Sequence, residues 1–179
     1  MNRERYSLPA MALHWLQAGL IVALLVIGWT MVDLPKGPER SAAFALHKSL
    51  GLCAFALIFI RLAWRRHRAP PAPSAQLLPW ERRLATATHR AFYPLLVLVP
   101  LAGYLSASFT RYPMKFFGRV LPSAGWPDET LNGIFNTLHK GALWALMLLL
   151  LLHVAGALRH ALRRDGVMSR MLPWRGRAD

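Results

Sequence analysis

The chain is poor in cysteine and in acidic residues. Cys53 is the single cysteine among 179 residues. This excludes an intrachain disulfide framework, a four-cysteine zinc site, a cysteine-ligated iron–sulfur cluster and a C-x-x-C-H attachment of a cofactor. Only 8 Asp and Glu stand against 22 Lys and Arg, and charged residues make up 17% of the chain against 55% hydrophobic residues. This composition excludes intrinsic disorder and is not typical of a soluble domain.

The chain contains long apolar runs with few charged residues. A bilayer core requires about 20 apolar helical residues, and four stretches satisfy that length. We expect helices at about residues 13–32, 43–64, 84–108 and 136–160, in one domain spanning 1–179 with a cytoplasmic tail at 163–179. The first stretch is too long for a signal peptide and no small-residue cleavage site follows it, so we expect it to remain in the mature protein. The sequence predicts an all-α integral membrane four-helix bundle.

The formal net charge of +14 follows a topological pattern. Basic residues interrupt the apolar runs, which favours membrane orientation over nucleic-acid binding as their role. One side holds 15 Lys and Arg, including Arg3, Arg175 and Arg177, and the other holds 7. By the positive-inside rule, both termini are expected to face the cytoplasm. The outer side is nevertheless basic as well, through Lys36, Arg40, Lys48, Arg111, Lys115, Arg119 and Lys140.

Histidine is the informative residue type. There are seven histidines, and six fall in or at the ends of the expected helices, whereas His67 lies in a basic loop. Ionisable residues inside a membrane are costly and usually functional. Placed by depth, the six form two levels: His47 and His139 on the outer side, and His14, His89, His153 and His160 on the inner side. His139 and His153 are 14 residues apart, which is close to four turns and ~21 Å, so they share a face.

Paired histidines from facing helices are natural axial ligands for haem iron. Zinc or copper is the alternative, but such sites usually collect three or four ligands, often with carboxylates or thiolates. The expected helix interiors contain no Asp or Glu, and the outer level has only two histidines. Gly51, Gly103, Gly141 and Gly156 near the histidines suit a large flat cofactor, although they also suit ordinary helix packing. We therefore favour two haems stacked across the bilayer. Spacing alone leaves the choice among four inner ligand candidates open.

These residues resemble a known family. His14-Trp15, the run His47 to Gly51, the run His139 to Gly141, His153 to Gly156 with His160, and the ending Arg170 to Pro173 are similar to the bacterial cytochrome b561 family. The resemblance covers nearly the whole chain. It implies a di-haem b protein of the bacterial inner membrane, with His14 and His153 on the inner haem and His47 and His139 on the outer haem. His89 and His160 are then left for a quinone site near the cytoplasm.

The resemblance is greatest to stand-alone members that pass electrons from superoxide to ubiquinone. In that reading Lys48, Lys140 and Arg111 attract superoxide to the outer haem. His89 or His160 protonates the quinone, and Arg82, Arg83 or Arg163 stabilises its anion. The alternative is a cytochrome b anchor that carries electrons for a periplasmic dehydrogenase or hydrogenase, with the outer basic surface docking that partner. The expected partners are membrane lipid, quinone and superoxide, and no nucleic acid.

Overall fold

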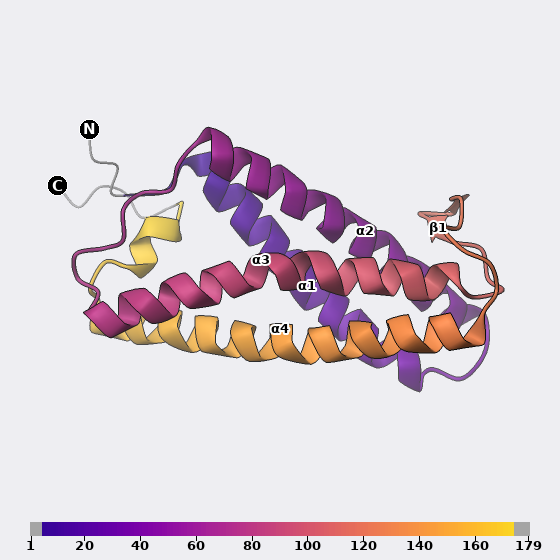
Figure 1. Ribbon diagram of the computed structural model, residues 1–179. Coiled ribbons are helices and arrows are strands. Elements are labelled where there is room, and N and C mark those ends of the chain that lie inside the picture. Colours follow the sequence, from indigo (N-terminus) through magenta and orange to yellow (C-terminus); the bar gives the residue numbers. More distant parts are fainter. Residues whose placement is uncertain (1–4, 174–179) are drawn as a thin grey trace.

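The computed structural model describes residues 5–173, and its four long helices form an elongated bundle (Figure 1). The helices are α1 (Leu8–Asp33), α2 (Pro38–His67), α3 (Pro79–Ser108) and α4 (Glu129–Arg163). A small hairpin of β1 (Lys115–Phe116) and β2 (Arg119–Val120) precedes α4, and the 3-10 helix η1 (Met168–Met171) follows it. The predicted four-helix, all-α architecture is confirmed, apart from this hairpin. Arg3 and residues 174–179 of the expected tail lie outside the described residues.

The helices extend beyond their apolar stretches, because the residues that favour a helix start lie outside those stretches. Pro9, Pro38 and Pro79 occupy the first turns of α1, α2 and α3, where a missing N–H costs no hydrogen bond. The Asp128 side chain caps α4 by accepting a hydrogen bond from the Leu131 N–H at 2.9 Å. Hydropathy locates the membrane-spanning part of a helix, whereas capping residues set its length.

The bundle consists of two helical hairpins, α1 with α2 and α3 with α4. The α3–α4 packing is the most extensive, and α2 joins the two hairpins by packing on α3. Ile58, Leu96 and Leu146 form the buried core where α2, α3 and α4 meet. α3 remains one helix despite Pro94 and Pro100, and changes direction near its middle (Figure 1).

Most of the apolar surface faces outward rather than into this core. Trp144, Leu148 and Leu151 on α4 are 64%, 59% and 66% exposed. A soluble monomer rarely exposes a continuous apolar surface of this kind. All four helices are long and apolar enough to cross a membrane. The fold is therefore that of a multi-pass membrane bundle whose lipid-facing surface is larger than its protein core.

The β1–β2 hairpin marks one end of the bundle, which we call the hairpin end (Figure 1). Phe117 and Gly118 form its turn with φ values of 44° and 88°, the positive values that a two-residue turn requires. The turn is fixed to α2, because the Phe117 N–H donates to Ser49 Oγ at 2.9 Å. Ser49 and the nearby Met114 are each only 2% exposed. The hairpin therefore packs against α2 two residues beyond His47.

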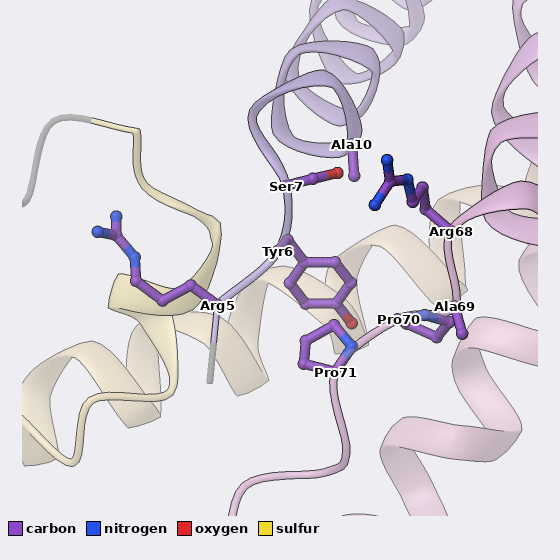
Figure 2. Close-up of a pocket in the computed structure, with 8 residues that line it drawn as sticks. All are labelled: Arg5, Tyr6, Ser7, Ala10, Arg68, Ala69, Pro70 and Pro71. Carbon is purple, nitrogen blue, oxygen red and sulfur yellow. The ribbon is translucent and has the colours of Figure 1, made fainter. Parts of the chain in front are cut away.

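The opposite end, which we call the termini end, carries both ends of the described chain. The Tyr6 N–H donates to the Arg170 carbonyl at 3.3 Å, and Trp15 Nε1 donates to the Met171 carbonyl at 2.9 Å. η1 is thus held against the start of α1. Figure 2 shows a small cavity beside this contact, between the N-terminal segment and the chain around Pro71. Its ~20 Å³ suits a single water molecule and is far too small for a quinone ring.

Candidate functional site

Two histidines face each other at the hairpin end. The rings of His47 on α2 and His139 on α4 have their centroids 6.4 Å apart and their planes at 87°. Glycines on the other two helices make room for them. A Cβ at Gly28 would lie 3.1 Å from His47 Cε1, and a Cβ at Gly103 would lie 3.0 Å from His139 Nδ1. All four helices therefore contribute to this pair, two with a histidine and two with a glycine.

The Nδ1 atoms of both histidines lie close to the backbone of a neighbouring helix. His139 Nδ1 lies 2.7 Å from the Val99 carbonyl oxygen. A carbonyl only accepts, so Nδ1 carries the hydrogen and Nε2 keeps its lone pair. His47 Nδ1 is buried near the backbone of Leu24 without a hydrogen bond of standard geometry. A metal-bound histidine usually donates its second N–H to a carbonyl in this way. His139 already has the tautomer that metal binding through Nε2 requires.

Three histidines meet at the termini end. The His153 ring on α4 lies 6.1 Å from that of His14 on α1 and 5.5 Å from that of His89 on α3, between centroids. Phe92 also packs on His153, at 5.5 Å. Depth alone placed four histidines at this level, and the structure brings three of them together.

The fourth, His160, has a different partner. His160 Nδ1 forms an ion pair with Asp165 Oδ2 at 2.6 Å, and the Val167 N–H donates to the other carboxylate oxygen at 3.2 Å. Burial raises the pKa of the Asp165 carboxyl, but these contacts outweigh that effect and hold it below its usual value. Within residues 5–173 no direct contact joins His160 to His89, the other residue expected at a quinone site.

An arginine also enters the termini-end cluster. Arg61 on α2 donates from Nη2 to His14 Nδ1 at 3.0 Å, and Arg61 is half-buried. In the sequence, Arg61 stands near the end of an apolar stretch, where a long basic side chain typically reaches the membrane surface. The contact could not be found from spacing, because it joins two helices 47 positions apart in sequence.

A buried carboxylate joins α3 to α4 at the same end. The Glu81 side chain is only 4% exposed and forms ion pairs with Arg159 and Arg163 at 2.9 and 3.1 Å. Arg159 also lies over the Trp80 ring, 4.9 Å from its centroid. Arg163 was one of three arginines expected to stabilise a quinone anion, and its charge is here compensated by Glu81.

The residues expected to attract an anion lie at the hairpin end. Lys48 follows His47 and is half-buried, whereas Lys140, which follows His139, and Arg111, which precedes the hairpin, are exposed. Of the glycines singled out in the sequence, Gly103 contacts a histidine. Among residues 5–173, a Cβ at Gly51, Gly141 or Gly156 would meet no atom within 4 Å outside the backbone of its own helix and its chain neighbours. The contact of Gly28 with His47 was not predicted from the sequence. The only signal was the position of Gly28 beside Trp29, about one turn before the end of an apolar stretch.

The two histidine sets fit haem better than a small metal ion. An iron bound by two opposing imidazole nitrogens at about 2 Å each holds the ring centroids about 6 Å apart. The His47–His139 and His14–His153 separations of 6.4 and 6.1 Å match this value. Within residues 5–173, no group of three or more His, Cys, Asp or Glu is arranged to hold a metal ion. The donor sets therefore suit a cofactor that supplies its other four ligands itself.

A membrane four-helix bundle with opposed histidines near both ends defines the class of a membrane cytochrome b. The family model for prokaryotic cytochrome b561 matches residues 5–174. The chain is also 32% identical over 178 residues to cytochrome b561 homolog 2 of Escherichia coli strain K12, covering 94% of this chain and 92% of that protein. The chain belongs to the prokaryotic cytochrome b561 family, so it is an electron-transfer membrane protein for which haem b is the implied cofactor.

Proposed function

We propose that this protein is a di-haem b oxidoreductase of the bacterial inner membrane that passes electrons from periplasmic superoxide to ubiquinone. Two superoxide anions are oxidised to two O₂, and one ubiquinone takes up the two electrons and two protons from the cytoplasmic side. The observation that carries the proposal is the presence of one opposed histidine pair near each end of a single apolar bundle. Bound haem supplies a one-electron couple at each pair.

The positive-inside pattern supports an orientation with both termini in the cytoplasm and the hairpin end outside. His47 and His139 would then hold the outer haem. At the termini end His153 has two possible partners, and the 6.1 Å separation from His14 suits an intervening iron better than the 5.5 Å separation from His89. This supports His14 and His153 as the inner ligands and leaves His89 free. The family resemblance gives the same pairs.

At the hairpin end the protein's own task is to attract and admit a small anion. Lys48 and Lys140 directly follow the two histidines, and Arg111 lies in the segment that leads to the hairpin. Their positive potential raises the local concentration of superoxide and its rate of encounter. Ser49 fixes the hairpin to α2 beside His47 and so limits how far this basic segment can move.

At the termini end the task is to deliver protons to a reduced quinone. His89 adjoins the histidine cluster, and His160 is hydrogen-bonded through Nδ1 to Asp165. Because Asp165 holds Nδ1, His160 presents Nε2 as its exchangeable nitrogen. Histidine is suited to this role because its charge changes near neutral pH. Asp165 follows the end of α4 and offers a route for replacing the proton from the cytoplasm.

A second candidate is an electron-carrying anchor for a periplasmic dehydrogenase or hydrogenase. The exposed basic residues of the hairpin segment, Arg111, Lys115 and Arg119, favour it, because they form a surface that an acidic partner protein can dock on. The anchor would use the same two histidine pairs but would not react with superoxide itself.

Stopped-flow absorption separates the two candidates. The purified holoprotein is mixed with a pulse of superoxide, the haem bands are followed, and ubiquinone is then added. Reduction near the diffusion limit that slows with salt and is reversed by ubiquinone supports the oxidase. Haem bands that superoxide barely changes would overturn it, and co-purification with a large periplasmic subunit would then identify the anchor.

A further inference from the structure

Arg61 is a cation in a membrane helix with no carboxylate partner among residues 5–173. It lies in the second half of α2 and is half-buried, and among residues 5–173 its side chain forms a hydrogen bond only with His14. Ionisable side chains within a membrane are costly and normally have a specific partner. Neutral imidazole is a weak partner for a guanidinium, which binds carboxylates through two parallel hydrogen bonds.

The carboxylates near this end are already engaged. Glu81 forms ion pairs with Arg159 and Arg163, and Asp165 pairs with His160 and accepts a hydrogen bond from the Val167 N–H. The remaining described acids, Asp33, Glu39, Asp128 and Glu129, lie at or near the helix ends that border the hairpin end. Residues 5–173 therefore contain no carboxylate that pairs with the Arg61 guanidinium.

The Arg61–His14 contact also conflicts with iron binding by His14. A guanidinium has only donors, so His14 Nδ1 must accept and the hydrogen of a neutral ring must sit on Nε2. Nε2 can bind iron only without that hydrogen, which then resides on Nδ1. Two donors would face each other across 3.0 Å. Iron binding by His14 therefore releases Arg61, which requires another acceptor within its reach.

We propose that this acceptor is a propionate carboxylate of the haem held by His14 and His153. The proposal rests on the haem assignment in the proposed function. A haem b brings two carboxylates with it, and they arrive at the same place and in the same event that frees Arg61. The guanidinium then helps to retain the inner haem. Its positive charge also offsets the propionate, which favours the reduced iron and raises the reduction potential of this haem.

Arg65 provides a matched control on the same helix. It lies one turn after Arg61, is exposed, and stacks over the Tyr93 ring at 5.6 Å from its centroid. Replacing Arg65 with Gln removes the same charge and the same donors without touching a histidine. An effect that appears for Arg61→Gln and not for Arg65→Gln therefore depends on position rather than on the net charge of this end.

The test is an optical redox titration of quinone-free holoprotein with the Arg61→Gln, Arg61→Lys and Arg65→Gln variants, together with haem-to-protein ratios. We expect Arg61→Gln to shift one of the two haem components to lower potential and to lower its occupancy. Arg61→Lys should restore most of both, and Arg65→Gln should leave both unchanged. Unchanged potentials and full occupancy in Arg61→Gln would overturn the proposal. The titration requires neither superoxide nor ubiquinone, so its outcome is independent of the reaction proposed above.

Haem esterification tests the partner itself, and it remains informative if Arg61→Gln fails to retain haem. The apoprotein of the wild type and of Arg61→Lys is reconstituted with haem b or with its dimethyl ester, which has no carboxylate. If the propionate is the partner, esterification weakens haem retention at the inner site, and it weakens it more with Arg61 than with the single-donor Lys. If the inner site of the wild type retains haem b and its dimethyl ester equally well, the propionate assignment is contradicted.

Discussion

The two ends of the bundle hold histidines in different settings. At the hairpin end, His47 and His139 lie against backbone and glycine, and a lysine directly follows each of them in the sequence. At the termini end, three histidines lie beside Arg61, with the His160–Asp165 pair and the Glu81 arginine cluster on the same side. The first setting suits electron transfer without protons. The second has spare titratable groups, as reduction of a quinone requires.

The largest expected effect is the loss of one haem at a time. In the proposed assignment His139→Ala removes a ligand of the hairpin-end haem and His153→Ala a ligand of the termini-end haem, so each variant is expected to retain one haem and lose the other. Haem per chain, measured by pyridine haemochrome, should fall to about half in either variant. His67→Ala, at the exposed end of α2, is the matched control and should retain full haem. Full haem content in His139→Ala or His153→Ala would contradict the paired assignment.

The next effect concerns the glycine contacts that distinguish the hairpin end. Gly103→Ala places a Cβ 3.0 Å from His139 Nδ1, which displaces the ring from the Val99 carbonyl. Disturbing a contact behind a ligand typically costs roughly 10–100-fold in affinity. We expect such a loss for the hairpin-end haem, measured by haem release to an acceptor protein. In Gly51→Ala the added Cβ meets no atom of another described helix or loop within 4 Å, and this variant should release haem like the wild type. Equal release from both variants would show that the close contact is unimportant.

A smaller effect is expected from the carboxylate that is specific to the termini end. Asp165→Asn leaves His160 without its charged partner, so ubiquinone reduction should slow about tenfold. Glu129→Gln, an exposed acid at the hairpin end, is the control and should not slow it. The measurement is the quinone-reduction rate of pre-reduced holoprotein from pH 5 to 8.

The pH dependence of this effect has a definite sign. The folded structure lowers the pKa of Asp165, so the carboxyl binds its proton more weakly there than in the unfolded chain. Its contribution to the free energy of unfolding is therefore complete above the ordinary pKa of about 3.9 and is lost as the pH falls through the lower pKa of the folded state. The carboxyl is thus ionised, and paired with His160, at every pH from 5 to 8. The deficit of Asp165→Asn should exist throughout pH 5 to 8. A deficit confined to the alkaline half of that range would contradict this assignment.

The smallest effect is electrostatic. Lys48→Gln with Lys140→Gln should slow haem reduction by superoxide a few-fold at low salt, and the difference should vanish at high salt because screening removes the steering of an anion. Lys36→Gln with Arg40→Gln removes the same charge from the α1–α2 connection and the first turn of α2, further along the chain from the histidines. A similar slowing in that control would show that net charge matters rather than position.

Much of the fold was predictable because it depends on one-dimensional signals. Apolar runs located the four helices, and a rise of 1.5 Å per residue sorted the histidines into two levels. Depth, however, could not separate the inner histidines. Their grouping depends on helix rotation, which brings His89 to His153 but leaves His160 apart.

The rest depends on three-dimensional contacts that spacing does not encode. The His160–Asp165 pair exists because Arg164 ends α4 with a left-handed backbone at φ 54°, which turns the chain back on the helix. The β1–β2 hairpin depends on a hydrogen bond to Ser49, 68 positions away. Arg61 lies 47 positions from His14. Its isolation between apolar residues was the one signal in the sequence that marked it.

The central claim is that electrons enter at the hairpin end and leave at the termini end, and the two single-haem variants test it directly. His153→Ala and His139→Ala holoproteins are mixed with superoxide in the presence of ubiquinone, and haem reduction and ubiquinol are followed together. The account predicts that His153→Ala is still reduced rapidly but forms little ubiquinol, whereas His139→Ala is hardly reduced by superoxide. Rapid reduction of His139→Ala and slow reduction of His153→Ala would contradict it, because superoxide would then react at the termini end.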